Sequence, residues 1–464
     1  NDNEMSISPT VGAMTRYFSR VRTGPLYTGA KKELHELIKH IPVVGEKMDR
    51  SINETLKVMR STLVPGHWFE EFGFDYFGPM DGHDMPRLLH TLEDLRARKG
   101  LTFLHLLTAK GKGHEDEHTD PQKLHGVKPK PTVPDHSGEA DPPKGAPVPK
   151  RPAYTTVFAD KLVELARADR RVVGVTAAMP DGTGLKSLAD ELPGQFHDVG
   201  ICEQHAVAFA GGLAKGGSRP VAAIYSTFLQ RGYDMVFQEL LIQGAPCVLA
   251  MDRAGLVDDG CTHHGLFDIA YLRTLPGVVL MAPTSAEEME AMLAWSLARQ
   301  DDAPATVAIR YPRDSAPQAS GPVPPIEEGR AVVVREGDDL ALAAYGTMVP
   351  LAEAAAELLS EQGIEATVIN ARFAKPVDAE TIGTEGSRLL VTMEEHATQG
   401  GFGAAVMEAL AATGRELPAT LMIGTPDRFI EHGTRADLMA RLGFTPRALA
   451  DRILQAIETP VGVA

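Results

Sequence analysis

The feature that most restricts the fold of this chain is an alternation of helical patterns with short, continuously apolar runs. Helical patterns at residues 154–168 and 285–299 flank apolar runs at residues 171–176, 220–225 and 246–251. Strands that are apolar along their whole length are buried on both faces, and such strands belong to parallel sheets covered by helices. The sequence therefore predicts an α/β fold.

The same alternation occurs near both ends of the chain. A helical pattern at residues 85–99 precedes an apolar run at 101–108, and a helical pattern at 350–362 separates apolar runs at 340–345 and 366–370. The remaining patterns predict helices at residues 31–40, 46–63, 234–243 and 403–412 and strands at 278–282, 389–393 and 420–423. We therefore predict three α/β domains in series, each a mainly parallel sheet covered by helices.

Two proline-rich segments divide the chain. Residues 126–152 hold eight prolines and show no apolar periodicity. A second group of prolines lies in the segment 317–330. Proline fixes φ and lacks an N–H donor, so both segments are typical of extended linkers. The domains are accordingly predicted at residues 1–125, 153–316 and 331–464.

Composition excludes several classes of function. The chain carries 62 Asp and Glu against 46 Lys and Arg, a net charge of −16, so it offers no broad basic surface for nucleic acid. It has no apolar run long enough to span a membrane, and its first residues do not show the basic and then apolar pattern of a secretory leader. Its three cysteines form no C-x-x-C pair, which suits a reducing compartment. A cytoplasmic enzyme without membrane or nucleic-acid partners is expected.

One apparent metal motif is interpreted as a loop. Residues 114–118 read H-E-D-E-H and fit H-E-x-x-H, in which a helix aligns two histidines on zinc. The segment follows Gly113, precedes Pro121 and has no apolar face to hold a helix, so a solvated charged loop is predicted.

The segment D-V-G-I-C-E-Q-H-A-V-A-F-A-G-G-L-A-K-G-G at residues 198–217 is the most informative one. It predicts a strand that brings Glu203 and His205 to the start of a helix rich in Ala and Gly. Small residues let such a helix approach a flat ligand or another backbone closely. Glu203 also has a structural interpretation, because a carboxylate at a helix N-terminus complements the dipole. That interpretation does not account for the whole E-Q-H element.

Motifs in a fixed order run through almost the whole chain. They are N-D-N-E-M-S-I-S (1–8), G-P-M-D-G-H-D (78–84), K-G-K-G (110–113), E-Q-H-A-V (203–207), Y-S-T-F-L-Q-R (225–231), D-R-A-G-L-V (252–257), D-G-C-T-H-H-G (259–265), R-Y-P-R (310–313) and R-F-A-K-P-V-D (372–378). Together they resemble the thiamine-diphosphate enzymes of the transketolase group, and most closely the 1-deoxy-D-xylulose-5-phosphate synthase family.

The resemblance implies roles for residues around the cofactor's rings. Glu203 resembles the carboxylate that hydrogen-bonds N1′ of the aminopyrimidine and so promotes deprotonation of thiazolium C2, while the cofactor acts as the electron sink. Phe228 is similar to the aromatic residue that packs on the pyrimidine, with Tyr225 on the same wall. Ordinary core packing is the alternative for both aromatic residues.

The resemblance also implies a magnesium ion on the cofactor's diphosphate. Asn3 resembles its side-chain ligand and Met5 its backbone ligand, since hard oxygen donors suit Mg²⁺. His114 stands where the family usually has Tyr after K-G-x-G and is expected near the cofactor. The family's G-D-G motif lies upstream of N-D-N and is not in this chain, which begins at Asn1; we therefore expect the chain to be cut from a longer protein.

The phosphate of the second substrate has its own implied site. Arg253, His263 and Arg313 resemble the cluster that holds the phosphate of glyceraldehyde 3-phosphate, and a guanidinium suits phosphate because it donates two parallel hydrogen bonds. Arg231 and Asp259 are similar to polar residues near the reacting carbons. For each arginine the alternative is a surface ion pair.

The resemblance implies a homodimer that condenses pyruvate with D-glyceraldehyde 3-phosphate on thiamine diphosphate and Mg²⁺. The products are 1-deoxy-D-xylulose 5-phosphate and CO₂, in the first step of non-mevalonate isoprenoid synthesis. It implies a fold made of the remainder of a diphosphate-binding domain, a pyrimidine-binding domain and a transketolase C-terminal-like domain. Two alternatives stay open: a transketolase, and a non-catalytic fragment that folds without binding the cofactor.

Overall fold

The structure is a computed structural model of the 464-residue chain. It describes residues 1–3, 5, 67–115, 119, 125, 151–383, 387–414 and 416–458. The helices predicted at residues 31–40 and 46–63 lie outside these residues, as does almost all of the linker predicted at 126–152. The chain divides into two compact units, residues 1–139 and 140–464.

The first unit is built on two parallel strands. Its elements are α4 (His67–Glu71), β1 (Asp75–Asp81), α5 (Met85–Arg96) and β2 (Thr102–Leu107). The side chain of Asp84 caps α5 by accepting a hydrogen bond from the amide of Arg87. Near the N-terminus, Asp2 exchanges backbone hydrogen bonds with Leu106 and Thr108, so residues 1–3 lie beside the end of β2.

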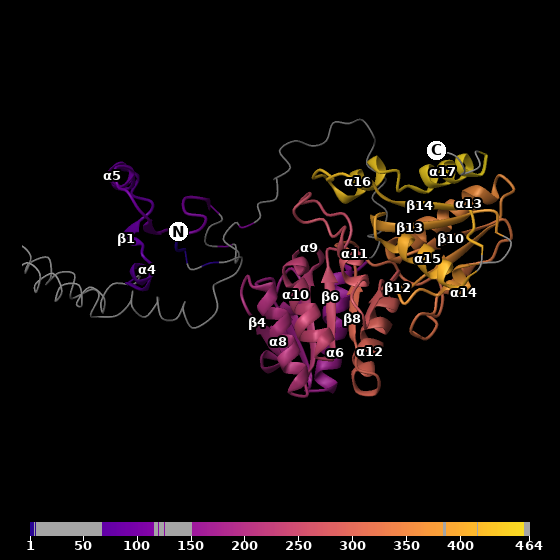
Figure 1. The fold of residues 1–464 in the computed structure, drawn as a ribbon, viewed down its shortest axis with the longest axis horizontal. Coiled ribbons are helices and arrows are strands. Elements are labelled where there is room, and N and C mark those ends of the chain that lie inside the picture. Colours follow the sequence, from indigo (N-terminus) through magenta and orange to yellow (C-terminus); the bar gives the residue numbers. More distant parts are fainter. Residues whose placement is uncertain are drawn as a thin grey trace, which may run out of the picture. The chain divides into compact units, whose positions relative to one another are not determined.

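A seven-stranded sheet forms the larger half of the second unit (Figure 1). Its strand order is β12-β7-β8-β6-β5-β3-β4, and every pair except β12–β7 is parallel. The strands are β3 (Val172–Thr176), β4 (Phe196–Asp198), β5 (Arg219–Tyr225), β6 (Cys247–Asp252), β7 (Val278–Met281), β8 (Thr306–Arg310) and β12 (Phe373–Lys375).

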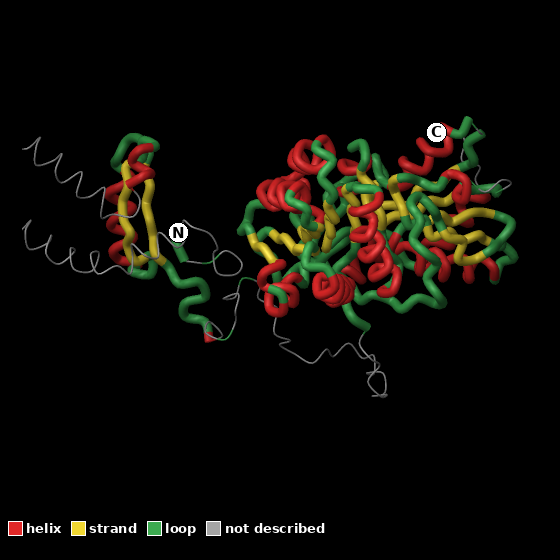
Figure 2. The backbone as a smooth tube through the Cα atoms, turned by 90° about the horizontal axis from the view of Figure 1, so that it is seen from below, coloured by secondary structure: helices red, strands yellow, loops and turns green. Residues whose placement is uncertain are grey.

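Alternate residues of these strands enter two different cores. Val221 and Ala223 of β5 pack with the apolar faces of α6, α7 and α12, whereas Ala222 and Ile224 pack with those of α8, η4 and α11. The sheet is therefore covered on both faces, as its continuously apolar strands predict (Figure 2). These helices are α6 (Tyr154–Ala168), α7 (Leu185–Glu191), α8 (Glu203–Lys215), η4 (Val236–Ile242), α11 (Asp268–Arg273) and α12 (Ala286–Asp302).

A five-stranded sheet in the order β14-β13-β10-β11-β9 forms the rest of the second unit. It is parallel except for β9. Its strands are β9 (Val332–Arg335), β10 (Leu340–Ala344), β11 (Ala366–Asn370), β13 (Leu390–Ala397) and β14 (Thr420–Thr425). Its helices are η5 (Gly346–Met348), α13 (Val349–Ser360), α14 (Ala379–Ile382), α15 (Phe402–Ala412), α16 (Arg435–Arg441) and α17 (Pro446–Glu458).

The fold class is the predicted one: mainly parallel sheets covered by helices. The two larger sheets are joined more closely than a series of separate domains suggests. Strand β12 follows β11 in the chain yet pairs antiparallel with β7 of the other sheet, with Phe373 opposite Met281. One hydrophobic cluster also combines Ile224 and Leu249 with Ile369 and Phe402.

The helix predicted at residues 234–243 has an unexpected geometry. After α10 (Tyr233–Met235), η4 is a π-helix. Helix α8 packs closely on it, because a Cβ on Gly211 would lie 2.9 Å from the carbonyl oxygen of Glu239. The short elements before it are α9 (Ser226–Leu229) and η3 (Gln230–Gly232), and η2 (Pro193–Gln195) precedes β4. Among the described residues, no helix combines the length and apolarity that crossing a membrane requires.

Candidate active site

The predicted residues of the second unit gather where the parallel strands end. Tyr225 closes β5, Arg253 directly follows β6, and Arg313 lies three residues beyond β8. Glu203 begins α8 after β4. The carboxyl ends of parallel strands share one edge of a sheet, and ligands of open α/β sheets bind beyond that edge.

Glu203 is a buried carboxylate paired with an exposed arginine. The residue is 3% exposed, and its oxygens lie 3.1 and 3.3 Å from Nη1 of Arg231. The Arg231 side chain is half-exposed and lies over the ring of Phe228, 5.2 Å from its centre. Glu203 is the first residue of α8, so its carboxylate also complements the helix dipole, although among the described residues no backbone amide donates to it.

An aromatic wall adjoins this pair. The rings of Tyr225 and Phe228 stack with centres 5.6 Å apart, and the rings of Phe228 and His263 meet edge to face with centres 5.2 Å apart. The guanidinium carbon of Arg253 lies 4.1 Å from the centre of the Tyr225 ring. The structure thus brings the predicted aromatic and phosphate-binding residues into one continuous cluster.

Arg253 is held in a fixed direction. Its Nη1 donates to the carbonyl of Gly182 and, at 2.8 Å, to Asp252, and its backbone has φ 58°. Asp252 is fully buried and also accepts hydrogen bonds from the amide of Arg253 and from Thr155 Oγ1, both at 2.7 Å. Within the described residues the side-chain hydrogen bonds of Arg253 all use Nη1, so its other N–H groups are available to a ligand. This arrangement suits the binding of an anion.

Arg313 and Asp259 lie at the outer side of the cluster. Their charged groups are 3.9 Å apart, and both side chains are about half-exposed, which describes a loose ion pair. Burial raises the pKa of Tyr225 to about 12, against the opposing charges of Arg253 and Arg313. Both arginines therefore act electrostatically on the same aromatic residue.

Comparison with known proteins identifies the family. A 1-deoxy-D-xylulose-5-phosphate synthase from Thermomicrobium roseum is 47% identical over 99% of this chain and 71% of its own length. The corresponding enzyme of Desulforudis audaxviator is 44% identical over 99% of this chain and 70% of its own length.

The chain belongs to the 1-deoxy-D-xylulose-5-phosphate synthase family.

Family models match successive parts of the chain. The model described as 1-deoxy-D-xylulose-5-phosphate synthase matches residues 1–108, transketolase pyrimidine binding domain matches 150–318, and transketolase C-terminal domain matches 329–449. Members of this synthase family are transferases that form 1-deoxy-D-xylulose 5-phosphate with thiamine diphosphate, so the chain is related to enzymes of that chemistry.

Solved transketolases share the architecture. A structure titled as a split-gene transketolase, inactive β4 tetramer, has a TM-score of 0.60 and 27% identity, covering 66% of this chain and 98% of that one. A Pichia stipitis transketolase has a TM-score of 0.54 and 17% identity, covering 66% of this chain and 46% of that one, which supports the fold alone.

Three of the predicted cofactor residues lie in the first unit. Asn3 and Met5 are half-buried, and Asn3 Oδ1 accepts a hydrogen bond from the amide of Met5 at 3.1 Å. An amide oxygen and a backbone carbonyl are donors that suit Mg²⁺. His114 is exposed in the turn that follows β2, where its amide donates to the carbonyl of Gly111.

Only the first two residues of the H-E-x-x-H motif lie in the described part of the chain, so its interpretation as a charged loop stays a prediction. His114 and Glu115 are exposed after the turn at residues 110–113, and residues 116–118 lie outside the described part of the chain. The described residues contain no group of three or more His, Cys, Asp or Glu side chains able to hold a metal.

The chemistry of the donor set fits the cofactor of this synthase family. Glu203 offers a buried anionic acceptor for a ring N–H, and the half-buried Phe228 beside it offers an aromatic face. Sequence reasoning missed Asp252 and Thr155, which orient Arg253. Asp252 stands in the recognised D-R-A-G-L-V motif and offered a signal, whereas Thr155 lies 97 residues away and offered none.

Proposed function

We propose that this protein condenses pyruvate with D-glyceraldehyde 3-phosphate to give 1-deoxy-D-xylulose 5-phosphate and CO₂, with thiamine diphosphate and Mg²⁺ as cofactors. The observation that carries the proposal is that the buried Glu203 carboxylate and the arginine cluster around Tyr225 lie next to each other, joined by Arg231 and Phe228. The first suits a cofactor and the second a phosphorylated substrate, so their proximity matches a reaction that joins the two. This reaction would be the first step of non-mevalonate isoprenoid synthesis.

The reaction breaks one carbon–carbon bond and forms another. Pyruvate loses its carboxylate as CO₂, its remaining two-carbon unit bonds to the aldehyde carbon of the acceptor, and one proton is taken up. Thiamine diphosphate, when bound, supplies the carbon nucleophile and the electron sink for this exchange. The residues of the chain bind, orient and move protons.

Each residue has a distinct part. Glu203 would accept the hydrogen bond of the aminopyrimidine N1′, with Arg231 as its ion-pair partner. Phe228 would pack on that ring, and Tyr225 would exclude water beside it. Asn3 and the carbonyl of Met5 would hold Mg²⁺, with His114 near the cofactor.

The acceptor's phosphate is assigned to three side chains. Arg253 and Arg313 would donate to its oxygens, with His263 completing the cluster from the edge of Phe228. Asp259 would face the reacting carbons. The loose pairing of Arg313 with Asp259 supports this assignment, because a guanidinium held only weakly is free to bind phosphate.

Product analysis tests the proposal. Incubation with ¹³C-labelled pyruvate, D-glyceraldehyde 3-phosphate, thiamine diphosphate and Mg²⁺ should give labelled 1-deoxy-D-xylulose 5-phosphate in the NMR spectrum. A transketolase would leave the pyruvate unchanged and, in a parallel incubation with a ketose phosphate in place of pyruvate, would consume that donor. That second result would overturn the proposal.

A second candidate, a chain that folds without catalysing, is favoured by one observation: the structural neighbour that spans 66% of this chain is titled an inactive tetramer. Calorimetry of the chain with thiamine diphosphate and Mg²⁺ separates the candidates, because the first requires binding. We also propose the domain limits 1–125, 153–316 and 331–464 and a homodimer in the cytoplasm, which ultracentrifugation tests for the assembly.

A further inference from the structure

Three of the proposed site residues lie in one segment, most of which forms a loop closed by its own backbone. Gly255 and Gly265 exchange backbone hydrogen bonds of 2.8 Å in both directions, which ties the two ends together. Within the loop, the amide of Val257 donates to His264 Nδ1 at 3.0 Å. We call residues 253–265 the acceptor loop, because they include Arg253, Asp259 and His263.

The base of the acceptor loop is buried, whereas its tip is exposed. Leu256 and Val257 are at most 2% exposed, but residues 258, 259, 261 and 262 are exposed. A loop with exposed charged residues at its tip keeps a defined geometry only if its base is anchored. The anchors come from the five-stranded sheet and the residues that follow it.

Glu395, in β13 of that sheet, is the central anchor. Its side chain is 1% exposed, and one carboxylate oxygen accepts the amide of Leu256 at 2.8 Å. The other oxygen accepts Thr347 Oγ1 at 2.7 Å and Arg435 Nη2 at 2.5 Å. A Cβ on Gly255, whose φ is +85°, would lie 2.5 Å from this carboxylate, so the loop backbone rests directly on it.

Arg435 extends the anchor to both sides of the site. Its guanidinium joins Glu395 to Asp314, at 2.6 Å, the residue after Arg313. Its backbone amide donates to the Asp258 side chain at 3.1 Å, beside Asp259. The arginine therefore connects the acceptor loop with the segment that carries Arg313.

Glu431 and His432, which shortly precede Arg435, also contact the acceptor loop. His264 accepts at Nδ1, so Nε2 carries the proton and donates to the carbonyl of Glu431 at 3.3 Å. Burial lowers the pKa of His264, in keeping with this neutral form. A Cβ on Gly260 would lie 3.0 Å from Cβ of His432, so the tip of the loop also packs closely.

We propose that Glu395 and Arg435 are positioning residues that set the geometry of the acceptor loop and thereby the specificity for a phosphorylated aldehyde. They lie far from Glu203 in the chain and act through the loop backbone rather than on the cofactor. The inference rests on the proposed function, because it assigns the acceptor's phosphate to this loop. It adds a function for the five-stranded sheet, which contributes none of the proposed site residues.

The test compares two buried glutamates in the same enzyme. Glu395→Gln puts an amide N–H₂ group opposite either the Leu256 amide or Arg435, both of which are donors. We expect kcat/KM for glyceraldehyde 3-phosphate to fall about tenfold or more, chiefly through KM, while KM for pyruvate stays within about twofold. Amide hydrogen exchange at Leu256 should accelerate.

Glu288→Gln is the matched control. Glu288 is also buried, pairs with Arg372 at 2.7 Å, and joins α12 to the segment after β11, so it connects the same two sheets without touching the acceptor loop. It should lower the melting temperature as Glu395→Gln does but leave the ratio of the two KM values unchanged. An equal shift of that ratio in both variants would overturn the inference.

Two further measurements keep the test decisive. If Glu395→Gln does not fold, Arg435→Gln replaces it, since it removes a single partner of Glu395, and Arg435→Lys should restore part of the lost acceptor affinity. Unchanged hydrogen exchange at Leu256 in a folded variant would contradict the anchor itself. If the unaltered enzyme forms no 1-deoxy-D-xylulose 5-phosphate, the proposed function fails, whereas the exchange data still report on the anchor.

Discussion

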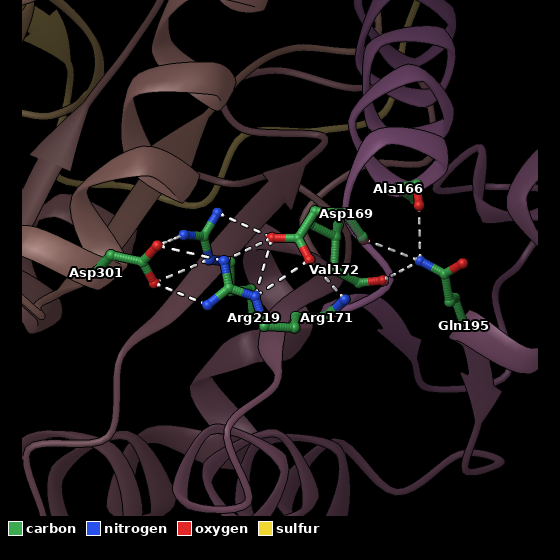
Figure 3. A network of polar contacts seen from close by, with 7 residues as sticks. All are labelled: Ala166, Asp169, Arg171, Val172, Gln195, Arg219 and Asp301. Atoms are coloured by element: carbon green, nitrogen blue, oxygen red, sulfur yellow. Dashed lines mark hydrogen bonds and ion pairs between the residues drawn. The ribbon is translucent and has the colours of Figure 1, made fainter.

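The two edges of the seven-stranded sheet both carry arginines and carboxylates, but they use them differently. At the amino-terminal edge, Arg171 and Arg219 face Asp169 and Asp301 in a network whose charges balance (Figure 3). At the carboxyl-terminal edge, Arg231, Arg253 and Arg313 lie beside aromatic rings or single carboxylates. Each arginine of the amino-terminal edge is paired with two aspartates, whereas the arginines of the carboxyl-terminal edge retain N–H donors for a ligand.

The amino-terminal network is dense. Arg171 Nη2 lies 2.9 Å from Asp169, its Nη1 lies 3.2 Å from Asp301, and Arg219 Nη1 lies 3.1 Å from Asp169. Beside it, the Gln195 side chain donates to the carbonyls of Ala166 and Val172 at 2.9 and 2.8 Å (Figure 3). Groups that satisfy one another in this way hold elements together and have little capacity to bind anything else.

The carboxyl-terminal edge shows the opposite pattern. Arg313 meets Asp259 only at 3.9 Å, and the half-exposed Arg231 has a single carboxylate partner among the described residues. Incomplete pairing identifies the edge where function is expected, and parallel strands direct ligands to that same edge. The comparison separates arginines that stabilise from arginines that bind.

The largest expected effect is on the phosphate site. Arg313→Ala should lower kcat/KM for glyceraldehyde 3-phosphate by about 2–4 kcal/mol of transition-state binding, or about 30- to 1000-fold. Unphosphorylated glyceraldehyde should lose much less, because it has no phosphate for Arg313 to contact. Steady-state rates with the two acceptors check this, and a matched fall for both would remove Arg313 from the phosphate site.

A smaller effect is expected at the other edge. Asp301→Asn should leave both acceptor rates unchanged and lower the free energy of unfolding by about 0.5–1 kcal/mol, since a half-exposed ion pair contributes at most about that much. Differential scanning calorimetry beside the acceptor assays measures both quantities. A loss of activity without a loss of stability would break the division between the edges.

The smallest effect concerns pH. Hydrogen bonds from Arg171 hold the pKa of Asp169 below its ordinary value. A depressed carboxyl pKa contributes stability above the ordinary pKa of about 3.9, and this contribution disappears as pH falls through the folded-state pKa. The difference in melting temperature between the unaltered protein and Asp169→Asn should therefore shrink as pH falls from about 6 to about 3. A difference that stays constant or grows would exclude this electrostatic role.

Periodicity predicted the elements that are both long and buried. The helix at residues 154–168 matches α6 because it has a helical apolar period, and the run at 366–370 matches β11 because a short, continuously apolar run favours a buried strand. Strand β12 was not predicted, since three residues carry no period and only their pairing with β7 makes them a strand. The π-helical geometry of η4 likewise has no signature in apolar spacing.

The site residues were found through motifs, and the residues that support them were not. Glu203, Tyr225 and Arg253 stand in motifs that the family resemblance identifies, and the structure places them at one sheet edge. Glu395 lies 139 residues from Leu256 in the sequence, yet it accepts a hydrogen bond from the Leu256 amide. No local sequence pattern predicts a contact over that distance, because the contact depends on how the two sheets pack.

The most direct test of the catalytic edge is exchange of the cofactor's C2 proton, followed by NMR in the enzyme with thiamine diphosphate and Mg²⁺. Glu203→Ala should slow this exchange by about 10- to 100-fold, because a hydrogen bond to a charged group contributes about 1.5–3 kcal/mol. Asp301→Asn, at the opposite edge, should exchange at the unaltered rate. Exchange in Glu203→Ala as fast as in the unaltered enzyme would contradict the account, because Glu203 would then serve only the start of its helix.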